Sequence, residues 1–208
     1  FCSMSDQTLP FMIYAEATPN PATMKFVANH LLVDDGLVYD FKSATDASKS
    51  PLAKQLFTFP FINGVFLTQN FVSLSKSEDV EWNEIMLEVR EYLSNYLNAG
   101  QPVLSENAIP KTAEQSDELV DRGQSDHNKA ETPIEEKIIE ILDDYVSPAV
   151  EGDGGAIHYS SYSDGKLTVV LKGACSGCPS STVTLKQGIQ ALFERMLPEV
   201  KEVIAEEQ

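Results

Sequence analysis

Cys175 and Cys178 are the residues of this chain whose type and spacing point most directly to chemistry. They stand in a CxxC run, at the point where a strand-like pattern gives way to a helix-like one. Two thiols at this spacing can hold one edge of a metal ion or iron–sulfur cluster, or can exchange disulfides. They make only half of a four-thiolate site, and Cys2, the third cysteine, lies at the start of the sequence. The site is therefore either open or completed by a second copy of the chain.

The residues around the second cysteine favour an exposed, reactive thiolate over a buried inert one. Pro179 suits the first position of a helix, which places Cys178 near the N-cap, where free backbone N–H groups and the helix dipole stabilise a negative sulfur. Gly177 allows a tight turn between the sulfurs, and Ser180 and Ser181 add hydroxyl donors. Soft thiolates select Zn, Cu(I) or iron–sulfur centres over hard ions.

The last third of the sequence predicts the elements that hold this pair. Thr132-Pro133-Ile134-Glu135 is a capping box that starts a helix, and Pro148 is expected to end it. The apolar face of this helix is predicted at Ile134, Ile138, Ile141, Leu142 and Tyr145. Two strands, 157–162 and 166–172, are joined by an Asp164-Gly165 turn. After the cysteines, a second helical stripe runs to Pro198 through Leu185, Ile189, Leu192, Phe193 and Met196, and residues 200–205 can form a final strand.

The first hundred residues predict a second unit. Strands are expected at 12–18 and 24–27, a short helix at 51–57, and a hairpin of strands 62–68 and 71–75. A long amphipathic helix follows from Trp82. Core positions are predicted at the aromatic residues Phe57, Phe59, Phe61, Phe66 and Trp82. We therefore expect an α+β protein of two small domains: a ββαββα unit at 11–100, a flexible acidic linker at 101–130, and an αββα(β) unit at 131–208.

Composition limits the classes of function. The formal net charge is −17, from 32 acidic and 15 basic residues, and the acidity is spread along the chain. Nucleic acids and anionic membranes need clustered Lys and Arg, so neither is expected as a partner. No apolar run approaches the ~20 residues of a membrane span. Three cysteines make no disulfide framework, which favours a reducing compartment. We expect a bacterial cytoplasm, with the mitochondrial matrix as the alternative if a presequence was removed.

Other polar residues carry no catalytic pattern. His30, His127 and His158 are scattered, and each is interpreted as a surface or structural residue. Glu151 and Asp153 fall short of a Ca²⁺ loop and are assigned to a turn. No Ser–His–Asp, P-loop or GxGxxG pattern occurs, so no enzyme activity is expected.

Longer runs of sequence resemble a known family. Residues 172–181, KGACSGCPSS, then 184–189, TLKQGI, resemble the NifU C-terminal domain of Nfu-type iron–sulfur proteins, as does the upstream run 148–155, PAVEGDGG. Ala156 departs from the family pattern, which often has an acidic residue there. The first unit resembles the Nfu N-terminal domain in these residues: Thr18-Pro19-Asn20-Pro21, Lys25-Phe26, Ser50-Pro51-Leu52-Ala53, Gly64-Val65-Phe66 and Trp82.

The resemblance implies a scaffold or carrier that is not an enzyme. It would bind a 4Fe–4S cluster through Cys175 and Cys178 of two protomers, receive it from upstream donors and pass it to apo-proteins. The N-terminal unit would recognise these partners or control access. Two alternatives stay open: a thioredoxin-like thiol–disulfide oxidoreductase, which also has CxxC at a strand-to-helix junction, and a dimer bridged by zinc. Against the former, the elements before the cysteines read α-β-β.

Overall fold

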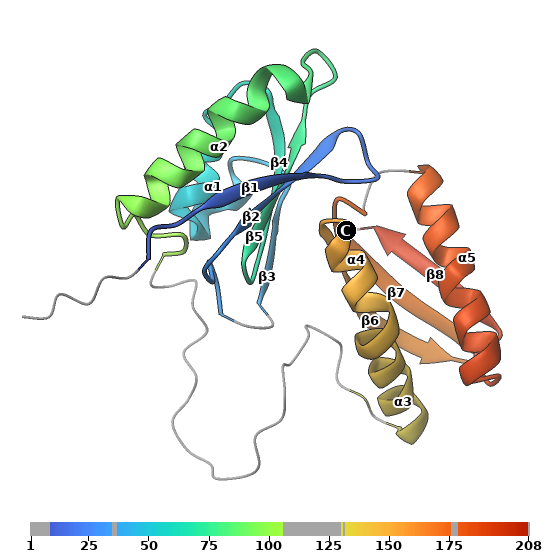
Figure 1. Ribbon diagram of the computed structural model, residues 1–208. Helices are drawn as coiled ribbons and strands as arrows, with labels where there is room; N and C mark the ends of the chain where they lie inside the picture. The colour runs from blue at the N-terminus through green and yellow to red at the C-terminus, as the bar shows by residue number, and fades with distance from the viewer. Residues whose placement is uncertain (1–8, 35–36, 106–129, 131, 176–178, 208) are drawn as a thin grey trace, which may run out of the picture.

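The computed structural model describes residues 9–34, 37–105, 130, 132–175 and 179–207. They form two units, each of which packs helices against a sheet, and this confirms the α+β class (Figure 1). Most of the expected linker, including His127, lies outside the described residues. Cys2 and Cys178 also lie outside them. Residues 101–105 are bonded to the N-terminal unit: Ser105 N–H donates to Lys49 O at 2.9 Å, and Ser50 Oγ donates to Val103 O at 2.7 Å.

The N-terminal unit is a five-stranded antiparallel sheet in the order β1-β2-β5-β4-β3. The strands are β1 (Ile13–Ala17), β2 (Thr23–Ala28), β3 (Val38–Phe41), β4 (Ile62–Thr68) and β5 (Phe71–Lys76). The helices are α1 (Pro51–Leu56), α2 (Trp82–Asn98) and a short 3₁₀ turn at Asp46–Lys49. The predicted hairpin and both helices are confirmed. β3 was not predicted, because four residues that include an aspartate give little strand signal.

Alternation along these strands separates two faces of the sheet. Phe26, Val65 and Leu74 point toward the helices and form the core with Trp82 and Val89. The opposite face carries one row of side chains across all five strands, because register pairs Glu16 with Lys25, Lys25 with Ser73, Ser73 with Phe66, and Phe66 with Asp40. We call Glu16, Lys25, Ser73, Phe66 and Asp40 the cross-strand row. Phe66 was predicted in the core with the other aromatics. Phe66 is buried as predicted, at 2% exposed, but in a separate small cluster on the outer face of the sheet.

The C-terminal unit packs two helical segments on one face of a three-stranded sheet. The first segment contains α3 (Pro133–Ile141), a π-helical turn (Leu142–Val146) and α4 (Ser147–Gly152). The sheet has the order β6-β7-β8, with β6 (Gly155–Ser163) antiparallel to β7 (Lys166–Gly173). The helix α5 (Pro179–Met196) then crosses to β8 (Glu202–Glu207), which is parallel to β7. The core between them holds Ile138, Leu142, Leu167, Leu171 and Phe193.

Two helix details differ from the sequence-based expectation. Pro148 does not end the first helix: it lies in the first turn of α4, where a proline's missing N–H costs little, after the π-helical turn. That turn inserts an extra residue into the helical repeat, so Val146 is buried and Tyr145, predicted on the apolar face, is exposed. Met196 is also exposed, and Leu197 is buried in its place. The capping box at Thr132 and the strand β8 are as predicted.

No helix among the described residues is both long and apolar enough to cross a membrane.

Candidate functional site

Cys175 lies just after β7, in a turn held against the end of α4. Gly173 has φ = 69°, a left-handed conformation that turns the chain out of the strand, and Ala174 N–H then donates to Gly154 O at 3.2 Å. Gly154 has φ = 84° and ends the α4 turn. Two glycine-dependent turns therefore meet beside the first predicted ligand.

The side chain of Cys175 is buried against Gly155. It is only 6% exposed and belongs to the core of the C-terminal unit. A Cβ added at Gly155 would lie 2.9 Å from Cys175 Sγ and 2.7 Å from Lys172 O. Only glycine at 155 lets the backbone approach the sulfur this closely. In this conformation the thiol is placed by the fold but is not presented to solvent.

The second predicted ligand, Cys178, lies outside the described residues. The helix α5 begins at Pro179, as the sequence predicts. Cys178 therefore directly precedes the helix in the chain, and its role as a ligand stays a prediction. Among the residues that the structure describes, no group of three or more His, Cys, Asp or Glu side chains could hold a metal ion.

The remaining candidate residues occupy structural positions within their own units. His30 Nε2 lies 2.9 Å from Leu9 O, and its ring makes an edge-on contact with Phe11 at 5.1 Å. His158 is 5% exposed within β6. Asp153 N–H donates to Ala149 O at 3.1 Å at the end of α4, in keeping with a turn.

Sequence reasoning missed the residues of the N-terminal unit that reach this site. Asn20 Nδ2 donates to Ala174 O at 3.2 Å, in a buried hydrogen bond to the residue directly before Cys175. Asp40 accepts a hydrogen bond from the Gly173 backbone. Burial raises the pKa of the Asp40 carboxyl above its ordinary value of 3.8, and this outweighs the opposite effects of Lys42, the Gly173 bond and Lys172. The one available signal was the alternation in β4 and β5, which places Phe66 and Ser73 away from the core.

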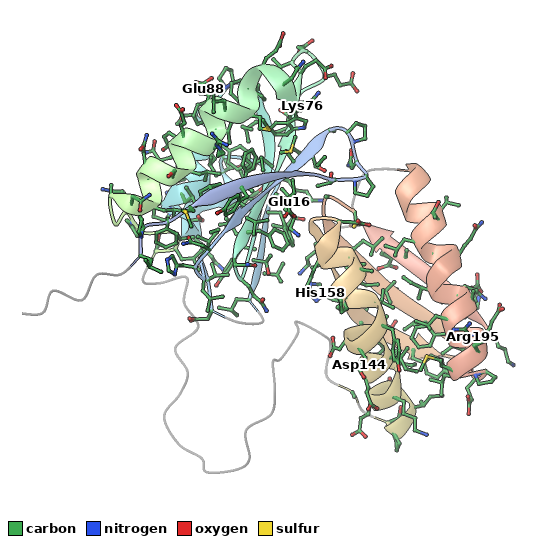
Figure 2. The ribbon with its side chains drawn as sticks, viewed as in Figure 1. Glu16, Lys76, Glu88, Asp144, His158 and Arg195 are labelled. Atoms are coloured by element: carbon green, nitrogen blue, oxygen red, sulfur yellow. The ribbon has the colours of Figure 1, made fainter. Side chains whose placement is uncertain are left out.

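A cavity of about 270 Å³ lies where the two units meet. It is lined by residues of β3, β4 and β5 and by Gly173 and Ala174 of the turn before Cys175. Figure 2 places Glu16 on the side of the N-terminal unit that faces the other unit, and His158 on the facing side of the C-terminal unit. Both units therefore shape the surroundings of Cys175.

Comparisons with known proteins match both units in the same order. The family described as "Scaffold protein Nfu/NifU N terminal" matches residues 13–100, and the family described as "NifU-like domain" matches residues 138–204. The chain therefore has an Nfu N-terminal domain followed by a NifU-like domain. Both matched segments coincide with units that have their own core, and the NifU-like segment contains the CxxC run.

Curated relatives extend the Nfu match over most of the chain. The protein named "NFU1 iron-sulfur cluster scaffold homolog, mitochondrial" from Drosophila sechellia is 37% identical over 194 residues, which cover 92% of this chain and 63% of the relative. Its namesake from Drosophila grimshawi is 38% identical over 194 residues, 92% of this chain and 60% of the relative. The chain thus spans less than two thirds of the length of these relatives.

The solved structures are less similar to this chain than the curated relatives are. The solution NMR structure of a NifU-like protein from Saccharomyces cerevisiae has a TM-score of 0.40 and 25% sequence identity, over 51% of this chain and 94% of the other. A crystal structure of a Staphylococcus aureus protein has a TM-score of 0.33 and 18% identity, over 41% of this chain and 99% of the other.

Proposed function

We propose that this chain is an iron–sulfur cluster scaffold and carrier, with Cys175 and Cys178 as the cluster ligands. The observation that carries the proposal is the CxxC run between β7 and α5 of a NifU-like domain, in a chain that offers no other credible thiolate pair. The names of the curated relatives, which call them iron–sulfur cluster scaffolds, support the same function. The cluster is cargo that enters and leaves, so no catalytic turnover is assigned to the chain.

The number of thiolates decides how the cargo is held. A protein-bound 4Fe–4S cluster normally takes four thiolates, and one chain supplies two. A two-fold axis through the cluster would let the same pair from a second protomer supply the others, since symmetric dimers are the commonest closed assembly. A site divided between two chains also opens when the chains part. This gives a carrier a physical route for release to an apo-protein.

The two alternatives fit the chain less well. A thioredoxin-like oxidoreductase has its CxxC run after a strand of a β-α-β arrangement, whereas here the run follows the antiparallel pair β6–β7. A zinc-bridged dimer uses the same four sulfurs and differs only in the metal. Zinc is therefore the alternative that an experiment must separate from iron.

Anaerobic reconstitution with iron and sulfide, followed by visible absorption, tests the assignment. Iron–sulfur centres absorb visible light, whereas Zn²⁺ has a filled d shell and is colourless. We expect a coloured protein whose bound iron and sulfide are equal in amount. A chain that stays colourless but retains zinc after the same treatment would overturn the iron–sulfur assignment.

We further propose that cluster donors and apo iron–sulfur proteins are the partners, and that the mitochondrion is the compartment. The relatives' names include the word mitochondrial, which favours the matrix over the bacterial cytoplasm among the two compartments expected from the sequence. Cell fractionation with an antibody against the chain tests the compartment. Recovery in the mitochondrial matrix fraction supports it, and recovery only in the cytosol contradicts it.

A further inference from the structure

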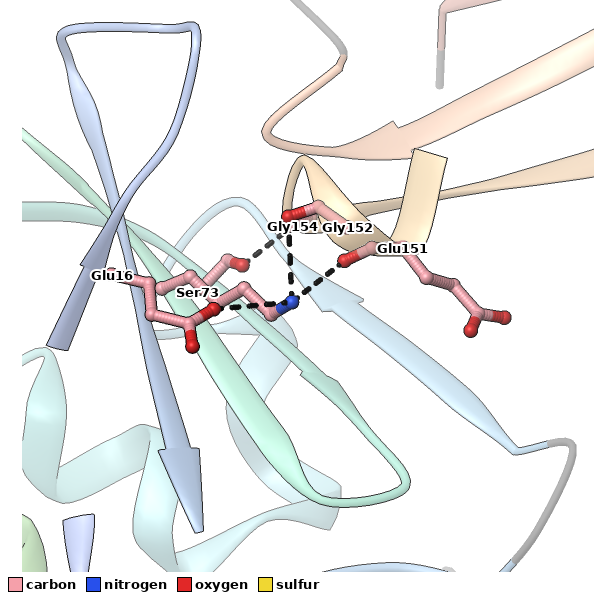
Figure 3. Close-up of polar contacts among 6 residues, drawn as sticks. Glu16, Ser73, Glu151, Gly152 and Gly154 are labelled. Carbon is pink, nitrogen blue, oxygen red and sulfur yellow. Dashed lines mark hydrogen bonds and ion pairs between the residues drawn. The ribbon is translucent and has the colours of Figure 1, made fainter. Parts of the chain in front are cut away.

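The cross-strand row of the N-terminal unit lies against two loops that flank Cys175. We call residues 151–156 and 173–174 the docking loops. Ser73 Oγ donates to Gly154 O at 2.7 Å, and Lys25 Nζ donates to Glu151 O at 2.9 Å and to Gly152 O at 3.4 Å (Figure 3). All these acceptors are backbone carbonyls. Gly154 permits the approach, because a Cβ there would lie 2.7 Å from Ser73 Oγ.

Lys25 brings a charged group to these contacts. Its ammonium group meets the carbonyls of Glu151 and Gly152 at the C-terminal end of α4, which carry the negative end of the helix dipole. The residue is 9% exposed, and its ammonium group pairs with Glu16 at 3.7 Å and lies 4.5 Å from the centre of the Phe71 ring. A buried ammonium needs such partners, and two of them come from the other unit.

An apolar contact also holds the first docking loop, 151–156, against the N-terminal unit. Phe66 and Phe71 form a small buried cluster with Ala156 of β6, where each is at most 7% exposed. Ala156 is the member of this cluster that the C-terminal unit supplies. A carboxylate there would be buried against two aromatic rings, at a large cost in free energy. Alanine at 156 therefore fits this contact between the units.

The second docking loop is held by three residues of the N-terminal unit. Asn20 and Asp40 bond Ala174 O and the Gly173 backbone. Phe66 lies so close to Gly173 that a Cβ there would be 2.8 Å from its ring. These contacts fix the backbone immediately before Cys175, while the first loop fixes Gly154, next to the glycine that contacts Cys175 Sγ.

We infer that the N-terminal unit is an intramolecular cap, whose cross-strand row docks on the two loops around Cys175 and keeps this thiol buried. For Sγ to leave the core, the backbone at 173–175 or at 154–155 must shift, and both stretches are held by the cap. The second half of the inference rests on the proposed function: the cap and a cluster-bridged second protomer compete for the same loops. Undocking then raises the fraction of chains able to take up cargo.

Reactivity of the Cys175 thiol in the apo chain tests the cap without any cluster. The full chain carries Cys2→Ser and Cys178→Ser, so that Cys175 is its only thiol. Ala156→Glu is added to undock the units, and Ser161→Glu, at an exposed position of the same strand, is the matched control. We expect Ala156→Glu to speed the reaction with a maleimide by about tenfold or more, because burying an unpaired carboxylate shifts the docking equilibrium by at least that factor. Ser161→Glu should leave the rate unchanged.

A second variant approaches the interface from the other unit. Lys25→Met combined with Ser73→Ala removes three hydrogen bonds to the docking loops and leaves the N-terminal core intact. This pair should also speed the reaction, and hydrogen exchange of residues 151–156 should become faster in both variants. Equal rates in the parent and in Lys25→Met/Ser73→Ala would overturn the cap, even if Ala156→Glu failed to fold.

The experiments can distinguish a failure of the cap from a failure of the proposed carrier function. If the wild-type chain takes up no cluster but the Cys175 thiol of the parent is unmasked by Ala156→Glu, the cap holds and the carrier assignment fails. If the wild-type chain takes up a cluster and both variants leave thiol reactivity unchanged, the carrier holds and the cap fails. In chains that keep all native cysteines, cluster uptake that is faster with Ala156→Glu than with Ser161→Glu would support the competition between cap and second protomer.

Discussion

Cys175 is buried in the core of the C-terminal unit, although the proposed function requires its sulfur to bind iron. The sulfur contacts Gly155, and the loops on both sides of it are bonded to the N-terminal unit. These contacts can break without unfolding either core. Apart from Cys175, none of the residues that make them belongs to the two main apolar clusters. The structure thus matches a chain that must rearrange locally before it takes up cargo.

At the residue scale, the ligand assignment predicts the effect of three cysteine substitutions. Cys175→Ala and Cys178→Ala should each abolish cluster binding, because each removes a ligand from both halves of a shared site. Both should leave the fold largely intact, since little apolar area is lost. Cys2→Ser is the matched control and should leave the visible spectrum of the reconstituted protein unchanged. A full-strength spectrum in either ligand variant would contradict the assignment.

Asp40 gives a second prediction at this scale. Its pKa is raised by burial, so the folded chain binds a proton there more readily than the unfolded chain does. The stability associated with Asp40 is therefore greatest at low pH and is lost as the pH rises through the raised pKa. Asp40→Asn should remove this loss and make the chain more stable near neutral pH, with a smaller gain in acid.

Urea denaturation between about pH 5 and pH 8 measures the Asp40 effect. Asp79→Asn, at an exposed position of the N-terminal unit, is the control and should change stability little at any of these pH values. If Asp40→Asn destabilised the chain most at the highest pH, the hydrogen bond and the neighbouring lysines would dominate over burial.

At the scale of elements, the capping box of α3 anchors the C-terminal unit. Thr132 N–H donates to Glu135 Oε2 at 2.8 Å, and Tyr159 OH donates to Glu135 Oε1 at 2.7 Å. Thr132→Ala should lower the free energy of unfolding by about 1 kcal/mol, the usual cost of a lost N-cap. Urea denaturation of the full chain measures it. Glu140→Ala, at an exposed position of the same helix, should cost much less. An equal loss of stability in both variants would argue against the N-cap role of Thr132.

Elements with local signals were predictable from the sequence, and those without were not. Thr132-Pro133-Ile134-Glu135 carries its own start signal, and Asp164-Gly165 adopts positive φ at both residues, as a tight hairpin turn requires. The Cys175–Cys178 spacing likewise pointed to the candidate site, whose ligands stay a prediction. β3 is too short to show a pattern. The extra residue in the π-helical turn, which exposes Tyr145, has no signature in the apolar repeat.

The contacts between the units could not be predicted, because they depend on pairs far apart in the sequence. Asn20 and Ala174 are 154 residues apart, and Lys25 and Glu151 are 126 apart. Neither residue of such a pair marks its partner. Alternation in β4 could have placed Phe66 on the outer face, but it could not have identified Ala156 as what covers it. The burial of Cys175 and the raised pKa of Asp40 follow from the same long-range packing.

At the scale of the whole molecule, the two cores are separate. Among the residues that the structure describes, the apolar cluster of the C-terminal unit contains only residues between Ile134 and Ala205. A fragment from Glu131 to Gln208 should therefore fold and take up a cluster without the N-terminal unit, as circular dichroism and visible absorption can show. A soluble, folded fragment that cannot be reconstituted would mean that the N-terminal unit contributes to the site itself.

Cluster binding and dimer formation should be linked, because each chain supplies half of the ligands. A net charge of −17 opposes self-association of the apo chain at low ionic strength, and the shared cluster is what offsets it. By mass action, each process then promotes the other. The apo chain should therefore be mostly monomeric, and the loaded chain should be a dimer.

Anaerobic sedimentation combined with iron and sulfide analysis of the same fractions tests this claim most directly. The account predicts a monomer before loading, and after loading a dimer with about four irons per two chains. A loaded monomer that holds about four irons would contradict it, because other residues or small molecules would then have to complete the coordination.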